Sequence, residues 1–354
     1  MHAYLTNVVR RTYIAARQRS YMDLVLAGKN RKAIIFFTPS RNNVNGGIMS
    51  IISLAKETEN LQSLHGADVF VCSYLGNPPL LKYTKFPNDR IILDFGQLLN
   101  RFEKGTEVLL HIPEYFVPTL LVRGAELMSM SSHNWKFNVL LQNIDMTPKR
   151  EHIETLSKIG SVTATTAHEA YSGMETQEAL GCIVHHLSSW GIPYPFERKP
   201  FSERENIFIV SPDLHEKREN ILGELRARLP EFKFVTIKRM AYADYRKLIA
   251  KAKFSLTFGE GLDGYFTEMI FGGGIGCAVY NTRFFTKEFK DIPFVYLSWE
   301  ALLTRLPGDV KAANIPGKYE SFNDAPYRLL NQQFSPEILR KNMISYYKTY
   351  FSRN

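Results

Sequence analysis

Hydrophobic and polar positions follow two different rhythms along this chain. From residue 32 onward, short continuous apolar runs bounded by turn residues alternate with longer stretches in which apolar residues recur every three or four positions. The first rhythm is typical of strands buried on both faces of a sheet, and the second of helices that cover such a sheet. Strands that alternate with helices predict an α/β fold with a parallel sheet.

The expected elements fall into two series. The first contains strands at 32–40, 67–75, 89–95, 106–113, 137–143 and 161–167, with helices that include 48–64 and 149–160. The second contains strands at 206–212, 232–238, 253–261 (with its loop), 275–281 and 292–299, with helices at 215–230, 242–252 and 264–274. A last helix is expected at 335–351, where Ser335 serves as the N-cap and Pro336 fits the first turn.

The regular alternation is interrupted between the two series. Three prolines, Pro193, Pro195 and Pro200, stand close together beside charged residues, which is typical of a linker. We therefore predict an N-terminal domain over 1–195, a C-terminal domain over 196–334, and a terminal helix over 335–354 that returns to the first domain. The first thirty residues are expected to form a basic helix, either packed on the domain in water or lying on an anionic membrane.

Composition narrows the classes of protein. With 354 residues and 45% hydrophobic content, the chain is too apolar for a disordered protein. Its net charge of +9 favours an anionic partner, such as an acidic membrane surface or a phosphorylated small molecule. Charged residues make up 22% of the chain, without long basic tracts or a nucleic-acid-binding motif, so we expect no nucleic-acid partner.

The cysteines and the apolar runs suggest a cellular location. Cys72, Cys182 and Cys277 form no CxxC pair, which indicates free thiols in a reducing compartment and argues against a zinc site. Arginines interrupt the N-terminus before any apolar core of a signal peptide develops. No run of about 18 apolar residues exists, so no membrane-spanning helix is expected. A cytoplasmic protein is predicted.

Residues 257–281, TFGEGLDGYFTEMIFGGGIGCAVYN, carry the most specific chemistry. The expected strand ends at Gly259, Gly261 punctuates the loop, and a helix begins near Gly264 and stops at the glycines 272–274. A turn of this kind presents backbone N–H groups and the positive end of a helix dipole, where a phosphate binds readily. The missing side chains allow a ligand to approach the backbone closely.

Two glutamates flank this turn. Glu260 and Glu268 are separated by seven residues, with the first on the loop and the second in the helix. One turn away from a phosphate, a carboxylate accepts hydrogen bonds from sugar hydroxyls, so the pair fits a diphosphate between two sugars, as in a nucleotide-sugar. The alternative is that both are surface carboxylates at this spacing by chance.

The segment EGLDGYFTEMIFGGGIGCAV resembles the signature EGFGLPxLEAMACGxPVV of retaining GT-B glycosyltransferases with the E-x7-E motif (family-four-like, glycosyltransferase group 1). It departs from the signature at 262–264, where the family has GLP. The resemblance implies two Rossmann-like doubly wound domains that face each other across a cleft. The first domain would bind the acceptor and the second the nucleotide-sugar.

The resemblance also implies roles for individual residues. Glu268 would bind the ribose, and Glu260 would lie near the donor sugar as a catalytic residue. Gly261 and the backbone N–H groups of Asp263, Gly264 and Tyr265 would contact the donor, chiefly its diphosphate.

Other segments match the family with less detail. Asn45, Gly46 and Gly47 match its N-terminal glycine loop, although an ordinary turn explains them equally well. His111, at a strand end, matches a histidine near the reacting sugar, or is a core histidine. Lys217 matches the lysine that neutralises the diphosphate, or is a solvated residue. Pro212 replaces the family's arginine, and Lys238 or Arg239 are candidates to supply that charge.

These motifs together lead to one expected activity. The chain would be a retaining glycosyltransferase that moves a sugar from a nucleotide-diphosphate donor to a polysaccharide or lipid-linked glycan acceptor, in cell-surface glycan biosynthesis. The leaving phosphate would accept the acceptor's proton, and no metal or other cofactor is expected. Association with the inner face of the membrane would bring it to its acceptor. The alternatives are a nucleotide-sugar epimerase of the same fold and a catalytically degenerate binding partner of another transferase.

Overall fold

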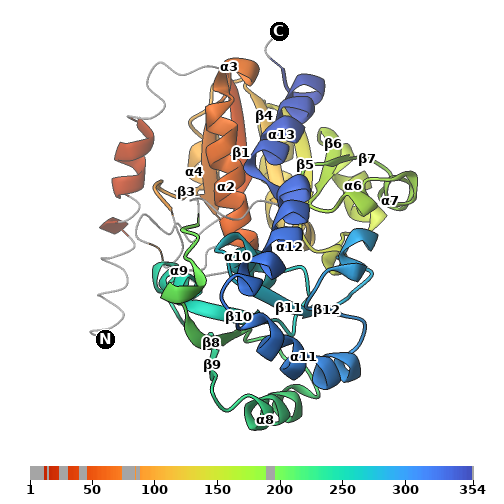
Figure 1. Ribbon diagram of the computed structural model, residues 1–354. Helices are drawn as coiled ribbons and strands as arrows, with labels where there is room; N and C mark the ends of the chain where they lie inside the picture. Colours follow the sequence, from red (N-terminus) through yellow and green to blue (C-terminus); the bar gives the residue numbers. More distant parts are fainter. Residues whose placement is uncertain are drawn as a thin grey trace, which may run out of the picture. The chain divides into compact units, whose positions relative to one another are not determined.

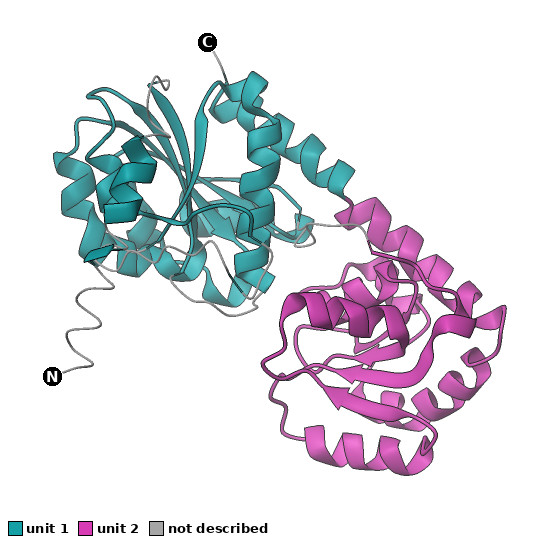
Figure 2. Ribbon diagram, turned by 90° about the vertical axis from the view of Figure 1, so that its left-hand side faces the viewer, with its two compact units in different colours: residues 1–191, 336–354 teal, residues 192–335 magenta. Residues whose placement is uncertain are grey.

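The computed structural model describes residues 12–13, 16–23, 31–39, 46–73, 84, 88–188 and 196–352. The chain divides into two compact units, residues 1–191 with 336–354 (unit 1) and residues 192–335 (unit 2), coloured separately in Figure 2. The predicted N-terminal helix lies mostly outside the described residues, within which 16–23 are helical. The loop 40–45, with Asn45, also lies outside them.

Unit 1 is built on a parallel sheet of seven strands in the order β3-β2-β1-β4-β5-β6-β7. The strands are β1 (Lys32–Phe37), β2 (Asp68–Ser73), β3 (Leu93–Asp94), β4 (Glu107–Pro113), β5 (Asn134–Leu141), β6 (Ser161–Thr166) and β7 (Ile183–His186). Ile35 pairs with Phe70 on one side and with Leu110 on the other, and all three are buried. The expected continuous apolar runs are therefore central strands covered on both faces.

Besides the helical residues 16–23, the α-helices of unit 1 are α2 (Gly46–Asn60), α3 (Gln62–His65), α4 (Phe95–Leu99), α5 (Val117–Met130), α6 (Arg150–Ser157), α7 (Met174–Leu180) and α13 (Pro336–Tyr350). The last of them belongs to this unit although it ends the chain. Helices α2 and α13 lie side by side (Figure 1), joined by the Tyr347 and Thr58 hydroxyls at 2.8 Å. Tyr346 and Tyr347 are 1% exposed, so this aromatic stripe packs inside the unit.

Unit 2 has a parallel sheet of five strands in the order β12-β11-β10-β8-β9. The strands are β8 (Glu205–Val210), β9 (Lys233–Thr236), β10 (Ala252–Leu256), β11 (Ile275–Val279) and β12 (Val295–Tyr296). The helices are α8 (Arg218–Arg228), α9 (Tyr242–Lys251), α10 (Gly264–Phe271), α11 (Trp299–Ala313) and α12 (Lys318–Phe334). Helices α11 and α12 were not predicted from the sequence; they contain Pro307 and Pro326 within their bounds.

The predicted α/β class with two parallel sheets is confirmed. Among the described residues, no helix is long and apolar enough to cross a membrane.

Candidate functional site

The strand order of unit 2 places a topological switch point between β8 and β10. The chain passes from β8 to β9 on one side and then returns to place β10 on the other side of β8. At such a switch point, the loops after the two central strands diverge and leave room for a ligand at the carboxyl ends. The backbone N–H of Phe258 donates to Ser211 Oγ at 2.9 Å, which ties the loop after β10 to the loop after β8. The glycine turn with Glu260 follows directly.

Asp263 occupies the N-terminus of α10. Its carboxylate accepts the backbone N–H groups of Tyr265 at 2.8 Å and Phe266 at 3.2 Å, and its other oxygen accepts the Thr257 hydroxyl. Aspartate is a favoured N-cap because it satisfies donors that have no partner in the first helical turn. The backbone N–H of Tyr265, which we expected to bind a diphosphate, is therefore taken by the chain's own carboxylate in this structure.

A second carboxylate lies beside this cap. A Cβ at Gly259 would lie 2.9 Å from Asp213 Oδ2 and 3.1 Å from Asp263 Oδ2. Both carboxyl groups therefore lie next to Gly259 and close to each other. The pKa of Asp263 is raised to about 7, chiefly by burial; the charges of Asp213 and Glu260 also raise it, and the Thr257 hydrogen bond lowers it. Near neutral pH the carboxyl group of Asp263 is therefore partly protonated.

Glu268 lies on α10, one helical turn after Gly264, and is 7% exposed. The Tyr242 hydroxyl, from the first residue of α9, donates to its Oε2 at 3.4 Å. Burial raises the pKa of Glu268 to about 8, while the Tyr242 hydrogen bond and the Arg246 charge oppose that shift. The carboxyl group therefore lies between α9 and α10 in a mainly protonated form at neutral pH, where it both donates and accepts hydrogen bonds.

The glycines around Glu268 have separate structural reasons. Gly261 has a φ of +88°, and a Cβ there would lie 2.5 Å from the Phe285 ring. Gly273 has a φ of +82° and ends α10, as expected for a glycine after a helix. Cβ atoms at Gly273 and Gly274 would each lie 3.2 Å from the guanidinium of Arg204, which is buried against them.

Two consecutive basic residues of unit 2, Lys217 and Arg218, make different contacts. The Lys217 ammonium pairs with Glu300 at 3.3 Å, with both side chains more than half exposed. Arg218, the next residue, is far less exposed and donates to the Ser211 carbonyl at 3.1 Å and to Thr236 Oγ1 at 3.2 Å. Ser211 and Thr236 stand at the ends of β8 and β9, so the Arg218 guanidinium lies at the switch point, where it also pairs with Glu219 at 2.5 Å.

The switch point of unit 1 lies between β1 and β4. Of the predicted glycine loop, Gly46 and Gly47 are the first two residues of α2. Gly46 is exposed, with no atom near its missing side chain. Gln142 donates from Nε2 to the Gly47 carbonyl at 3.1 Å. Its own backbone N–H donates to the buried carboxylate of Glu114 at 3.2 Å, so these contacts connect the ends of β4 and β5 to the first turn of α2.

His111 lies inside unit 1. It is 2% exposed, and its ring stacks on Phe36 with the centroids 4.3 Å apart. Its Nδ1 accepts from Asn138 Nδ2 at 2.9 Å, which leaves Nε2–H to donate to the Tyr347 hydroxyl at 3.2 Å. Burial, together with the neighbouring His65, lowers the pKa of His111 to about 3, so the ring is neutral. His111 is thus a core histidine in which both ring nitrogens have hydrogen-bond partners. Its catalytic role stays a prediction.

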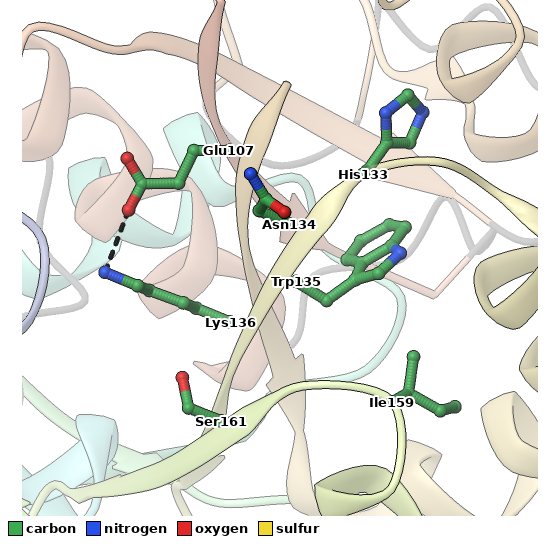
Figure 3. Close-up of a pocket in the computed structure, with 7 residues that line it drawn as sticks. All are labelled: Glu107, His133, Asn134, Trp135, Lys136, Ile159 and Ser161. Atoms are coloured by element: carbon green, nitrogen blue, oxygen red, sulfur yellow. Dashed lines mark ion pairs between the residues drawn. The ribbon is translucent and has the colours of Figure 1, made fainter. Parts of the chain in front are cut away.

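A pocket of about 470 Å³ lies away from both switch points, at the amino ends of strands in unit 1. Figure 3 shows its lining residues: Glu107, His133, Asn134, Trp135, Lys136, Ile159 and Ser161. Glu107 and Lys136 form an ion pair of 2.8 Å there, and Lys32 pairs with Glu107 at 3.2 Å. Since ligands of such sheets bind at the carboxyl ends, we do not assign this pocket to the site. In the ranges that the structure describes, no group of three or more His, Cys, Asp or Glu side chains could hold a metal ion.

No protein-family model matches the chain, and no curated protein matches it. Among solved structures, Alr3699/HepE from Anabaena in complex with UDP-glucose is similar, with a TM-score of 0.56, 12% identity, and coverage of 89% of this chain and 99% of that one. Sucrose-phosphate synthase from Thermosynechococcus elongatus gives a TM-score of 0.54 and 9% identity, covering 90% and 99%.

A chain of the Glycosylation Associate Protein (Gap123) complex from Streptococcus agalactiae is also similar, with a TM-score of 0.42 and 10% identity. The match covers 73% of this chain and 59% of that chain. At these identities the comparisons show the fold alone: this chain has the two-unit α/β architecture of GT-B proteins.

Several residues of the site were not found from the sequence. Asp213 lies in the loop after β8, and Arg218 and Tyr242 are the first residues of α8 and α9, far from the 257–281 segment. No spacing in the sequence connects them to Glu268, because only the strand order brings these segments together. The sequence signal that was available is that Asp213 directly follows an expected strand and that Tyr242 begins an expected helix.

Proposed function

We propose that this protein is a glycosyltransferase that binds a nucleotide-diphosphate sugar at the turn between β10 and α10. The proposal rests chiefly on the buried position of the Glu268 carboxyl group. This group lies at the switch point of a nucleotide-binding type of sheet, held by Tyr242, eight positions after the loop residue Glu260. The similar HepE structure contains UDP-glucose, which supports a nucleotide-sugar as the ligand class.

The proposed roles follow from charge. Glu268 binds the ribose hydroxyls, and Glu260 faces the transferred sugar. As the bond between the sugar and the diphosphate breaks, negative charge grows on the leaving group, and preorganised positive charge stabilises it. Arg218 supplies such charge at the ends of β8 and β9, in addition to Lys217, and compensates for the arginine that Pro212 replaces. We propose transfer with retention and without a metal, on a glycan or lipid-linked acceptor.

A specific observation favours a second candidate, a degenerate binding partner of another transferase. Asp263 already occupies N–H groups of α10, Asp213 lies beside it, and Lys217 is paired with Glu300. Each of these contacts disfavours a diphosphate. In this candidate, the fold and Glu268 remain, but the charge needed to stabilise a leaving diphosphate is insufficient.

We expect at least one nucleotide-sugar in a panel of UDP-glucose, UDP-N-acetylglucosamine and GDP-mannose to raise the Tm of the protein. A ligand that binds only the folded state stabilises it by mass action, by about 2.7 kcal/mol at a hundredfold excess over Kd. The measurement is a thermal melt with each compound, with glucose 1-phosphate, which has a sugar and a phosphate but no nucleoside, as the control. If none of the three nucleotide-sugars shifts the Tm, the proposed function is wrong.

Product analysis then separates the candidates. A transferase releases the nucleotide diphosphate in proportion to the glycoside formed when a glycan or lipid-linked acceptor is added. An epimerase converts the nucleotide-sugar alone into its epimer. A degenerate partner binds the donor and leaves it unchanged under both conditions.

A further inference from the structure

The pocket of about 470 Å³ in unit 1 lies at the amino ends of three neighbouring strands. Glu107, Asn134 and Ser161 are the first residues of β4, β5 and β6, and all three line the pocket (Figure 3). Pockets that bind small ligands in proteins have volumes of about 300–1,000 Å³. The pocket is therefore large enough for a small ligand, at the edge of the sheet opposite to the switch point.

Ion pairs fix one wall of this pocket. The Glu107 carboxylate pairs through Oε1 with Lys136 at 2.8 Å and through Oε2 with Lys32 at 3.2 Å. Lys136 also donates to the Tyr350 carbonyl at 3.1 Å, in the last turn of α13. Lys32 donates to the Ser352 carbonyl at 2.7 Å. Because these side chains are already held in place, a ligand does not have to order them when it binds.

The charges of the pocket are balanced. Burial raises the pKa of Glu107, but the hydrogen bonds and charges of Lys136 and Lys32 outweigh it and lower the pKa below its ordinary value. The carboxylate is thus ionised at neutral pH, and its charge is paired with that of Lys136. A phosphate, a carboxylate or an amine would have to break this pair to gain a counter-charge. The balance favours an uncharged ligand.

The aromatic residue of the pocket leaves no ring face free for stacking. Trp135 is 5% exposed, and its ring stacks on that of Phe137 with the centroids 5.6 Å apart. A nucleobase or another flat ligand binds best on an open aromatic face. The polar groups that remain are the Asn134 carboxamide and the Ser161 hydroxyl, both on exposed residues. Each of them donates and accepts hydrogen bonds, as a ligand hydroxyl does.

We propose that this pocket binds an uncharged sugar residue of a glycan chain. The sugar hydroxyls bond to Asn134 and Ser161, and its C–H groups pack on Ile159 and the edge of Trp135. The role of the site rests on the proposed function: the bound chain is the acceptor. With eight residues in β5 and a rise of roughly 3.3 Å per residue, the pocket lies roughly 23 Å from the carboxyl ends of the sheet. A chain that reaches both edges contains several sugar residues, so the site favours long acceptors.

The test is binding of the wild-type protein to an array of immobilised oligosaccharides, without any nucleotide. The array carries neutral chains of glucose, galactose, mannose, rhamnose or N-acetylglucosamine, and the same chains with sulfate or uronic acid groups. We expect at least one neutral chain to bind, and its charged counterpart to bind no better. Ser161→Trp, which fills the pocket, should abolish this binding. Asn134→Ala should weaken it about tenfold, because hydrogen bonds to the sugar are lost.

Ala179→Trp is the matched control. Ala179 is exposed on α7 of the same unit and does not line the pocket, so this variant should bind as the wild-type protein does. The sugar site is refuted if the wild-type protein binds no neutral chain, or if Ser161→Trp and Asn134→Ala bind as strongly as Ala179→Trp. A preference for the charged chains would refute an uncharged ligand.

These outcomes are separate from those of the proposed function, because no nucleotide is present in the binding experiment. If no neutral chain binds while a nucleotide-sugar raises the Tm, the sugar site is wrong and the proposed function stands. If a neutral chain binds in the pocket while no nucleotide-sugar raises the Tm, the sugar site stands and the proposed function is wrong.

Discussion

Replacing Arg204 with methionine is expected to lower the free energy of unfolding of unit 2 by about 3 kcal/mol or more. Arg204 is 5% exposed and follows the short turn before β8. Its guanidinium donates to the Ile249 carbonyl at 3.1 Å, in the last turn of α9, and to the Ala252 carbonyl at 2.6 Å. It also donates to the carbonyl of Gly272, directly after α10.

The size of the effect follows from what methionine leaves behind. Carbonyl groups at the ends of helices have no partner within the helix, and each buried one that loses its donor costs about 1–3 kcal/mol. Methionine keeps the apolar volume of the stem but donates no hydrogen bond. The measurement is hydrogen exchange of the β10 and α10 amides in increasing denaturant, followed by mass spectrometry. It gives the unfolding midpoint of unit 2 separately from that of unit 1.

Arg228→Met provides the comparison for Arg204→Met. Arg228 also donates to backbone carbonyls, those of Leu303 and Thr304, but it is exposed on α8. Water replaces its hydrogen bonds, so the loss should stay within about 0.5 kcal/mol. Equal midpoints for Arg204→Met and Arg228→Met would show that the buried guanidinium does not stabilise unit 2.

Replacing Glu268 with glutamine is expected to change how stability depends on pH. The pKa of Glu268 is raised to about 8 in the folded protein, chiefly by burial. Between its ordinary pKa and about 8, the folded state keeps a proton that the unfolded state has lost, so the stability of the wild-type protein falls as pH rises, by at most about 1.4 kcal/mol per pH unit. Below its ordinary pKa the group is protonated in both states and makes no pH-dependent difference.

Glutamine has no titratable proton, so the fall in stability with rising pH that Glu268 causes is absent from the variant. Relative to the wild-type protein, Glu268→Gln should therefore gain stability between about pH 5 and pH 8.5, measured by chemical denaturation at both values. Asp263 contributes a similar slope up to about pH 7 in both proteins. Glu224→Gln, an exposed change on α8 with the same charge difference, should follow the wild-type curve. Parallel curves for Glu268→Gln and the wild-type protein would contradict a buried carboxyl group with a raised pKa.

The fold class could be predicted because each strand and helix has its own pattern of apolar residues over a short stretch of sequence. Continuous apolar runs at 32–37, 68–73 and 107–113 became strands of a parallel sheet, and periodic stretches became helices. Helices α11 and α12 were not predicted, and each contains a proline in its interior, which local preference disfavours. Packing overrides that local preference: Pro307 and Pro326 are both buried.

The site was predictable only in part, for a different reason. The glycine turn and the two glutamates are contiguous, so their spacing could be read directly. The sequence does not show that Asp263 binds its own helix or that Asp213 lies beside it, because those facts depend on side-chain direction and strand order. Likewise, the run 272–274 was explained as a helix stop, whereas the structure adds neighbours that a side chain would meet: the Arg204 guanidinium at Gly273, and chiefly the Met269 sulfur at Gly274.

If the carboxyl group of Glu268 holds a nucleotide-sugar by its ribose at the β10–α10 turn, removing that group must weaken binding. The decisive experiment is a titration of UDP-glucose, the ligand in the HepE structure, into the wild-type protein, Glu268→Ala and Glu224→Ala. We expect the wild-type protein and Glu224→Ala to bind with equal affinity, and Glu268→Ala to bind at least about tenfold more weakly. Binding of equal strength by Glu268→Ala, or no binding by the wild-type protein, would contradict the claim.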